Sequence, residues 1–388
     1  MSSTTQTCAE AIVESLIRGG VDTVFGIPGA QTYALFDALY KNRERIRTFV
    51  TRHEQGAAYM AFGYAKSTGK VGVYCVVPGP GVLNSTAGLC TAHNTPVLCI
   101  AGQVPSAFVG VGHGMLHELP AFRWQEGIAT IQLIRIDIDP TQSVRLRGDL
   151  SIVADSRLAL QALLRELRED PGDRSSLEAE FEAVKAEAWR EIQQIQPQMS
   201  YLDVMREVLP RDAFVVEEIS QVGFTAWYGF PVYEPGKLVT GGYQGNLGHG
   251  FQTGIGVKIA NPHSTVVSIA GDGGFMYGVQ ELATAVQYKV GLITLIFNNN
   301  AFGNVRRDQI EFYEGRVFGS ELTNPDFVTL AESFGARAHR VNSPAELGDR
   351  LHGALEESKR GPVVIEIPCE TGSEASAFRL LLPANYGR

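Results

Sequence analysis

Two short polar motifs follow two apolar segments in the last third of the chain, and their side chains could bind a metal ion together. The segment "VVSIAGDGG" places Asp272 among three glycines, and in "ITLIFNNNAFG" three asparagines follow the apolar run. Each apolar segment predicts a buried strand, and residues 278–289 between them predict a crossover helix. Strands joined in this way are parallel, and their carboxyl ends meet at one edge of the sheet. We therefore expect Asp272 and Asn299 to converge.

A carboxylate oxygen and an amide oxygen at that edge are hard donors, which suit Mg²⁺ or Ca²⁺ better than a soft metal. Mg²⁺ commonly completes its shell with water and phosphate oxygens, so a diphosphate ligand is expected beside it. Gly271, Gly273 and Gly274 would let the backbone approach that diphosphate, whose charge the following helix would favour. An ordinary turn that uses glycine for its geometry is the alternative for "GDGG" alone.

A separate carboxylate, Glu54, follows the strand predicted in "IRTFVTRHEQ" and begins a helix. This is again the carboxyl end of a strand, where a carboxyl group could transfer protons to or from a ligand. The alternative is a glutamate in the first helical turn that only complements the helix dipole.

Two similar sets of elements position these residues. Apolar strands alternate with helices in residues 5–120 and again in 200–370, which predicts two α/β domains with doubly wound parallel sheets. Between them a short joint, mostly helical and rich in charge and alanine, contains one convincing strand in "IQLIRIDIDPT". The expected boundaries are 1–120, 121–198 for the joint, 199–370, and a C-terminal tail at 371–388.

Composition and charge exclude several classes of protein. The formal net charge is −9, which leaves no basic stripe for a phosphate backbone, so we expect no nucleic-acid partner. No segment has the roughly 20 uninterrupted apolar residues of a membrane span, and the first residues do not resemble a leader, so we expect a cytoplasmic protein. The five cysteines are scattered and are expected to be free thiols.

The spacing of GDGG and NNN resembles the diphosphate and Mg²⁺ motif of thiamine-diphosphate enzymes. Other segments are similar to the branch of acetohydroxyacid synthase, pyruvate oxidase and benzaldehyde lyase: "RHEQGAAYMAFGYAKSTGK", "VVPGPGVLNSTAGL", "NTPVLCIAGQVP" and "NPDFVTLAESFGA". The resemblance covers nearly all of residues 5–120 and 200–368. It implies thiamine diphosphate and Mg²⁺ as cofactors, with a pyrimidine-binding domain at 1–120 and a diphosphate-binding domain at 199–370.

The resemblance also implies roles for single residues at the metal site and at the catalytic carboxylate. The side chains of Asp272 and Asn299, together with the backbone carbonyl of Ala301, would be the metal ligands. Glu54 would exchange a proton with the aminopyrimidine ring of the cofactor.

Further residues are implied around the cofactor. The carbonyl of Gly245 would accept a hydrogen bond from the pyrimidine amino group, and Leu247 would support the bent cofactor unless it is ordinary core. Gln103, Pro78 and Gly79 would line the site. In this family the cofactor lies between the first domain of one chain and the second domain of another, which implies a homodimer or tetramer.

The chain departs from the family pattern in its middle. Most relatives carry a third doubly wound domain there, about as large as the outer two. Here "GHGMLHELP" runs through "AFRWQEGIAT" straight into "IQLIRIDIDP", which looks like the closing strand of that domain. Most of the middle domain is therefore missing, and because relatives bind FAD mainly through it, we expect no FAD.

The leading functional hypothesis is a lyase or carboligase dependent on thiamine diphosphate and Mg²⁺ that acts on 2-oxo acids. An acetolactate-synthase-like reaction on pyruvate is the first choice, with a small-molecule 2-oxo acid or aldehyde as reaction partner. A simple 2-oxo acid decarboxylase and a benzaldehyde-lyase-like 2-hydroxy ketone lyase are alternatives. A non-catalytic scaffold of the same fold is an alternative of another class. A nicotinamide dehydrogenase is disfavoured, because no G-x-G-x-x-G motif follows a first strand.

Overall fold

The computed structural model describes residues 7–29, 32–92, 95–102, 134–138, 140, 150–166, 177–241 and 246–372. Contacts between Cα atoms divide the chain into two compact units. The first unit joins residues 1–108 with 186–388 and contains two parallel sheets, and the second unit is residues 109–185.

The N-terminal sheet of the first unit has four parallel strands in the order β2-β1-β3-β4. These strands are β1 (Thr23–Gly26), β2 (Arg47–Val50), β3 (Gly72–Val76) and β4 (Val97–Ala101). The helices are α1 (Cys8–Arg18), α2 (Tyr33–Lys41), α3 (Glu54–Thr68) and α4 (Pro80–Thr91). α1 begins with a reciprocal cap, in which the side chains of Thr7 and Glu10 each accept a hydrogen bond from the other residue's backbone N–H.

The C-terminal sheet has six parallel strands in the order β11-β12-β10-β9-β7-β8. They are β7 (Phe214–Val216), β8 (Leu238–Val239), β9 (Val266–Gly271), β10 (Ile293–Asn298), β11 (Arg337–Arg340) and β12 (Val363–Pro368). The helices are α8 (Gln198–Val208), α9 (Gln221–Gly229), α10 (His249–Ala260), α11 (Asp272–Met276), α12 (Glu281–Gln287), α13 (Gly303–Phe312), α14 (Phe327–Ser333) and α15 (Pro344–Glu357), followed by a 3₁₀ turn at Ser358–Arg360.

Alternate residues of β9 face two different cores, as the pleat of a strand requires. Val267 and Ile269 pack in a core with α8, α9 and α15. Val266 and Ala270 pack in the other core, with α10, α11 and α14. The sheet is therefore covered on both faces, and the expected doubly wound α/β architecture is confirmed.

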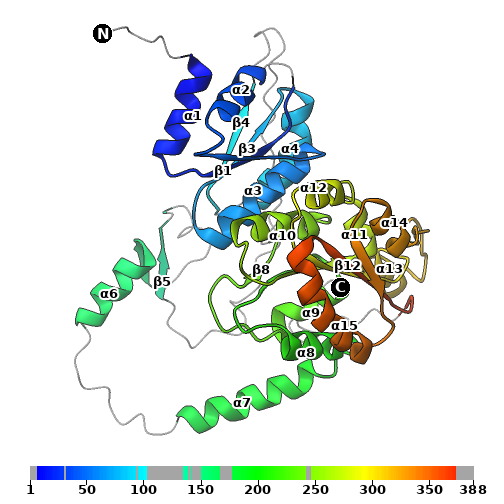
Figure 1. The fold of residues 1–388 in the computed structure, drawn as a ribbon. Coiled ribbons are helices and arrows are strands. Elements are labelled where there is room, and N and C mark those ends of the chain that lie inside the picture. Colours follow the sequence, from blue (N-terminus) through cyan, green and yellow to red (C-terminus); the bar gives the residue numbers. More distant parts are fainter. Residues whose placement is uncertain are drawn as a thin grey trace, which may run out of the picture. The chain divides into compact units, whose positions relative to one another are not determined.

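The two sheets repeat one arrangement. In each sheet, the first strand in sequence pairs with both the second and the third. The helix that follows the second strand, α3 in one sheet and α10 in the other, lies where the two halves meet. These two helices pack side by side (Figure 1). Their backbones nearly touch, because a Cβ atom on Gly256 would lie 2.1 Å from the Met60 carbonyl oxygen, and one on Gly63 would lie 2.3 Å from that of Thr253.

Several elements differ from the sequence prediction. The helix expected at 278–289 is present as α12, which is shorter at both ends, and the short helix α11 before it was not anticipated. α9, α13, β11 and α15 were not anticipated. In the second unit, β5 (Ile134–Asp137) is the expected strand, but it pairs in parallel with an unexpected one, β6 (Leu150–Val153).

The remaining helices belong to the joint. α6 (Ser156–Glu166) lies in the second unit, and α7 (Leu177–Ile192) runs across the boundary between the two units. Through the whole described part of the chain, no helix has both the length and the apolar character needed to cross a bilayer.

Candidate functional site

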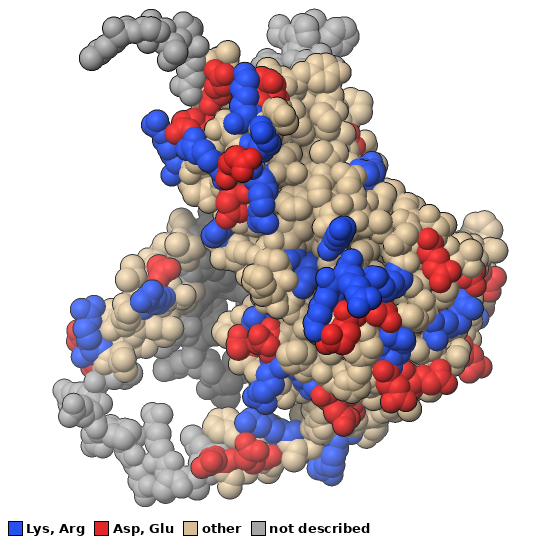
Figure 2. All heavy atoms as spheres, in the orientation of Figure 1, with Lys and Arg blue, Asp and Glu red and all other residues tan. Residues whose placement is uncertain are grey.

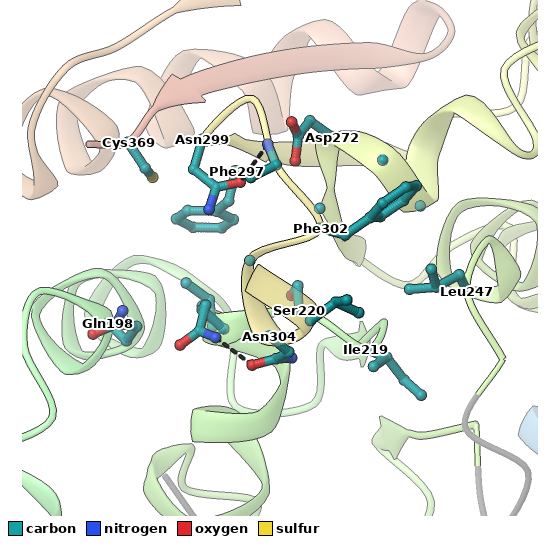
Figure 3. A pocket seen from close by; sticks show the side chains of 18 of the residues that line it. Gln198, Ile219, Ser220, Leu247, Asp272, Phe297, Asn299, Phe302, Asn304 and Cys369 are labelled. Carbon is teal, nitrogen blue, oxygen red and sulfur yellow. Dashed lines mark hydrogen bonds between the residues drawn. The ribbon is translucent and has the colours of Figure 1, made fainter. Parts of the chain in front are cut away.

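A cavity of about 200 Å³ lies at the carboxyl end of the C-terminal sheet. β9 and β10 are parallel neighbours; Asp272 directly follows β9, and Asn299 directly follows β10. Both residues and Ala301 line this cavity, as Figure 3 shows for the two side chains. The two strand ends thus bring the carboxylate and the amide to one place.

The carboxylate of Asp272 is held by an amide that the sequence prediction missed. Asn324 Nδ2 lies 2.6 Å from Asp272 Oδ2, 3.0 Å from Asn298 Oδ1 and 3.3 Å from Asn300 Oδ1. Burial raises the pKa of Asp272, although the hydrogen bond from Asn324 opposes that shift. A cation beside this carboxylate would favour its ionised form. Only the "NPDF" segment hinted at Asn324.

Two longer helices begin at the same cavity. Ser220 caps α9, its Oγ accepting from the Gly223 backbone N–H at 3.1 Å, and Asn304 lies in the first turn of α13. The Gln221 side-chain amide donates to the Asn304 side-chain oxygen, which ties the two helix starts together (Figure 3). Unpaired backbone N–H groups and the helix dipole favour anions at such positions. The cavity therefore combines oxygen ligands for a metal with a surface suited to phosphate.

The glycines of the "GDGG" turn differ in how much room they have. A Cβ atom on Gly274 would lie 1.6 Å from Glu218 Oε1, and one on Gly273 would lie 2.5 Å from the Phe302 ring. Any larger residue would push these neighbours away or into the cavity. Gly271 has more space, since its nearest neighbour would be Ser220 Cβ at 3.5 Å.

Two adjacent carboxyl groups are buried near this turn, and one of them, Glu218, lies against it. Glu217 and Glu218 are fully buried, and Glu218 Oε1 accepts from the Gly248 backbone N–H at 2.7 Å. Glu217 Oε1 accepts from Gly241 N at 3.2 Å. Burial raises the pKa of Glu218 to about 8 and that of Glu217 to about 7. Glu218 thus links the loop at Gly248 to Gly274. The paired acids in an apolar strand, "VVEEIS", were the available signal.

The loop before α10 carries Leu247, which is half-buried and lines the cavity. The neighbouring Asn246 donates from Nδ2 to the Ala87 carbonyl and to Thr91 Oγ1, both at 3.0 Å. His249 Nδ1 donates to the Asn246 carbonyl at 2.7 Å, and burial lowers the pKa of His249, which favours the neutral ring. The loop is therefore held by α4 on one side and by α10 on the other. Gly245 lies outside the described residues.

Glu54 is the first residue of α3 and is half-buried. Its Oε2 accepts from Asn84 Nδ2 at 3.1 Å. The two residues before it are fixed by a buried carboxylate at the start of α12, because Glu281 Oε1 accepts from the backbone N–H groups of Arg52 at 3.0 Å and His53 at 2.8 Å. Glu281 and Asn84 were both missed from the sequence, since neither contact is local.

The structure does not bring all the expected residues together. The described residues that line the cavity fall between 197 and 369, so Glu54, Pro78 and Gly79 are not among them. Pro78 and Gly79 form the turn before α4, where Gly79 has a φ of 68° that favours glycine. Gln103 lies outside the described residues.

Within the described residues, no three side chains of His, Cys, Asp or Glu lie together as a metal-binding group. The candidate metal site depends instead on one carboxylate, one amide and one backbone carbonyl. Such a donor set is compatible with Mg²⁺, which often takes only one or two carboxylates from a protein.

Two family models match the chain, together covering more than half of it. The N-terminal TPP binding domain of thiamine pyrophosphate enzymes matches residues 6–124, and the C-terminal TPP binding domain of the same enzymes matches residues 218–367. The chain therefore belongs to the thiamine pyrophosphate enzymes, thiamine pyrophosphate being another name for thiamine diphosphate. The resemblance drawn from the sequence motifs is confirmed.

Curated relatives align over nearly their whole length. "Acetolactate synthase isozyme 3 large subunit" of Escherichia coli (strain K12) is 24% identical, covering 94% of this chain and 95% of the relative. "Probable 2-ketoarginine decarboxylase AruI" of Pseudomonas aeruginosa is 26% identical, covering 94% of both. The first alignment runs over 548 positions, whereas this chain has 388 residues, so many residues of the relative have no counterpart here. This fits the absence of most of a middle domain.

A solved structure has the same fold. The thiamine diphosphate-dependent 4-hydroxybenzoylformate decarboxylase of Rhodococcus jostii RHA1 superposes with a TM-score of 0.75, covering 94% of this chain and 99% of that chain. Its sequence identity is 16%, so the comparison supports the architecture alone.

Proposed function

We propose that this chain is a thiamine-diphosphate- and Mg²⁺-dependent lyase or carboligase acting on 2-oxo acids. The observation that carries the proposal is the cavity at which Asp272, Asn299 and Ala301 meet the first turns of α9 and α13. The names of the curated relatives favour an acetolactate-synthase-like reaction, with pyruvate as the first substrate to test.

The residues of the cavity suit the cofactor that the family uses. Asp272, Asn299 and the carbonyl of Ala301 would bind Mg²⁺, while the backbone at Gly271, Gly273 and Gly274 would approach the diphosphate. Bound there, thiamine diphosphate would supply an electron sink for breaking a carbon–carbon bond of the substrate. Leu247 would support the thiazolium end, and Glu218 would keep its loop in place through Gly248.

Proton transfer falls to Glu54. Its carboxyl group would exchange a proton with the aminopyrimidine ring, while Asn84 orients it and Glu281 fixes the chain just before it. Gly245 would accept from the pyrimidine amino group, and Gln103 would face the substrate.

Self-association is part of the proposal. Since Glu54 is not among the described residues that line the cavity in one chain, a second chain would bring its Glu54 to the site. The Pro78–Gly79 turn would arrive with it. We infer a homodimer or tetramer in which each cofactor lies between two chains, without FAD.

A simple 2-oxo acid decarboxylase is the second candidate. It is favoured by the relative named as a 2-ketoarginine decarboxylase. Both reactions release CO₂ from the 2-oxo acid. They differ in whether the remaining acyl carbon is protonated, which gives an aldehyde, or is joined to a second carbonyl compound.

One screen distinguishes these outcomes. The purified protein with thiamine diphosphate and Mg²⁺ is given a panel of 2-oxo acids, with and without aldehyde acceptors, and CO₂ and ligated products are measured. Ligated product from pyruvate supports the carboligase, and CO₂ with free aldehyde alone supports the decarboxylase. Absence of any turnover that depends on the cofactor would contradict both.

A further inference from the structure

A second hollow, of about 470 Å³, lies away from the candidate active site. Its walls are β2, the C-terminal end of α10 with the turn after it, the turn before β10, and the end of α15 with its 3₁₀ turn. Leu247 precedes α10, whereas Lys258 lies near the other end of that helix. Roughly 15 Å of helix therefore separates the two sites.

The hollow is lined by positive charge in a chain whose formal net charge is −9. Figure 2 shows Lys and Arg side chains gathered near the middle of the drawn face, between α12 and α15. Five lining residues can carry a positive charge: Arg47, Lys258, His263, Lys289 and Lys359. No Asp or Glu belongs to the described lining. A concave surface of one sign concentrates ions of the opposite sign.

Lys258 is the most informative of the five. It is half-buried, and its ammonium donates to two backbone carbonyls, Ser264 at 2.7 Å and Pro262 at 3.1 Å. Within the described residues it has no carboxylate partner, and burial lowers the pKa of Lys258. A charge withdrawn from water without a counter-ion is costly, and an anion in the hollow would offset that cost.

The other cations are also available to a ligand. In the described part of the chain, the side chains of Lys289 and His263 make no hydrogen bond or ion pair, and both are exposed. Lys359 pairs with Glu356 on the surface, and Arg47 lies 3.8 Å from Asp22 and donates to Thr23 Oγ1 at 2.9 Å. Exposed pairs of this kind are weak, so an incoming anion can compete with them.

One wall of the hollow is aromatic. The rings of Phe49 and Tyr288 meet edge to face, with their centroids 4.9 Å apart. The Tyr288 hydroxyl accepts from the Val50 backbone N–H at 2.8 Å, which fixes the tyrosine against β2. The hollow therefore offers an apolar ring surface beside its positive charge, and its size is within the range of small-molecule sites.

We propose that this hollow binds a phosphorylated small molecule that carries an aromatic ring, of the class of the nucleoside phosphates. Its phosphate would bind to Lys258, Lys289 and Arg47, and its ring would pack against Phe49 and Tyr288. Arg47 and Phe49 belong to β2 of the N-terminal sheet, which precedes Glu54. Lys258 and Lys289 belong to segments that connect strands of the C-terminal sheet, so the ligand would bridge the two sheets. Binding would stabilise the contact between them.

The test titrates AMP, adenosine and ribose 5-phosphate separately into the protein by calorimetry. Saturating thiamine diphosphate and Mg²⁺ are present, so that the diphosphate cavity is filled and does not compete. AMP is expected to bind, with an affinity at least about tenfold above either of its parts, and to raise the Tm. Added salt is expected to weaken the binding.

Lys289→Glu is the informative variant, because its exposed side chain can be replaced without disturbing the fold. It is expected to weaken AMP binding by at least about tenfold, whereas Lys185→Glu, the same charge change on α7, leaves it unaltered. Absence of AMP binding, or equal binding by wild type and Lys289→Glu, would overturn the site. Equal affinity for AMP and ribose 5-phosphate would overturn the assignment of the aromatic wall to the ring.

Discussion

At the scale of single residues, the candidate site depends on carboxyl groups whose surroundings differ. Asp272 is buried beside amides and needs a cation to remain ionised at low cost. Glu218 is buried without any Lys or Arg partner among the described residues, and it is expected to be largely protonated at neutral pH. Glu54 is half-buried with one amide partner. The three carboxyl groups therefore suit a metal ligand, a structural hydrogen-bonding group and a proton carrier, in that order.

Asp272→Ala is expected to raise the concentrations of Mg²⁺ and thiamine diphosphate needed for half-maximal activity, by on the order of tenfold or more. The reason is the loss of the only side-chain carboxylate that lines the described cavity. Titrations of each cofactor, followed by turnover, measure the effect. Asp349→Ala, which removes an exposed acid from α15, is the matched control. Unchanged requirements for both cofactors would remove Asp272 from the metal site.

Glu54→Gln is expected to lower kcat by about 10²- to 10⁴-fold while cofactor affinity changes little. The amide keeps the size of the side chain and its contact with Asn84, but it cannot exchange a proton. Steady-state kinetics together with a cofactor titration separate the two quantities. Glu44→Gln, at a highly exposed position before β2, should behave as wild type. Wild-type turnover in Glu54→Gln would refute the proton-transfer role.

Glu218→Gln is expected to change how stability depends on pH. The folded-state pKa of Glu218, about 8, is above the ordinary value of 4.5, so the unfolded chain releases this proton first as pH rises. This group therefore makes the wild type progressively less stable between pH 4.5 and 8, whereas glutamine cannot titrate. The difference in Tm, variant minus wild type, should become more positive between about pH 5 and about pH 8. Glu207→Gln, an exposed control, should show no such trend; a flat difference for Glu218→Gln would contradict the prediction.

At the scale of elements, the contact between α3 and α10 positions the site. α3 begins with Glu54, and α10 begins two residues after Leu247, so the angle and distance between these helices decide where both residues lie. Small residues allow the backbones to approach closely, and Gly256 faces the Met60 carbonyl oxygen. An error in this packing would move both residues relative to the cavity.

Gly256→Ala is expected to destabilise the protein by about 1–3 kcal/mol, and by more if the helices cannot separate. Its Cβ would lie 2.1 Å from a backbone oxygen, and this clash outweighs the gain of up to about 1 kcal/mol that alanine brings to a helix. Chemical denaturation measures the free energy of unfolding. Gly353→Ala is the control, because its Cβ would meet mainly the movable guanidinium of Arg350, and it is expected to be neutral or stabilising. Equal effects of the two substitutions would show that the helices are not tightly packed.

At the scale of the whole molecule, two sheets of one design would each contribute half of the proposed cofactor site. The cavity with Asp272 is lined by residues between 197 and 369 in the described part of the chain, while Glu54 begins α3, which packs with the N-terminal sheet. If the cofactor lies between chains, each active site takes its Glu54 and its Asp272 from different chains.

Mixing two variants tests that arrangement, at cofactor concentrations too low for Asp272→Ala to be active by itself. Glu54→Gln and Asp272→Ala chains, unfolded together and refolded, should regain activity. In each mixed dimer, one of the two sites contains both a native Glu54 and a native Asp272. For random pairing this predicts about a quarter of the wild-type activity. Sedimentation of the same samples measures the oligomeric state. If the mixture stays as inactive as its components while it is dimeric, both residues of a site come from one chain.

Much of this architecture could be predicted from local pattern. Strand-helix alternation, the parallel pairing of β9 with β10 and the placing of Asp272 and Asn299 at neighbouring strand ends follow from apolar periodicity and from glycine and asparagine at turns. The helix expected at 278–289 is α12, but it begins later than expected, because the turn between α11 and α12 makes contacts with residues distant in sequence. Gly278, in that turn, approaches the side chain of Gln252.

The supporting residues belong to the tertiary structure. Asn324 reaches Asp272 across 52 positions of sequence, and Glu281 reaches the His53 backbone across 228. Periodicity carries no information about such pairs, because it reports which face of an element is buried and not what meets that face. The chain alone thus determined the kind of sheet and the chemistry at its edge, while only folding decided which distant side chains hold that edge in place.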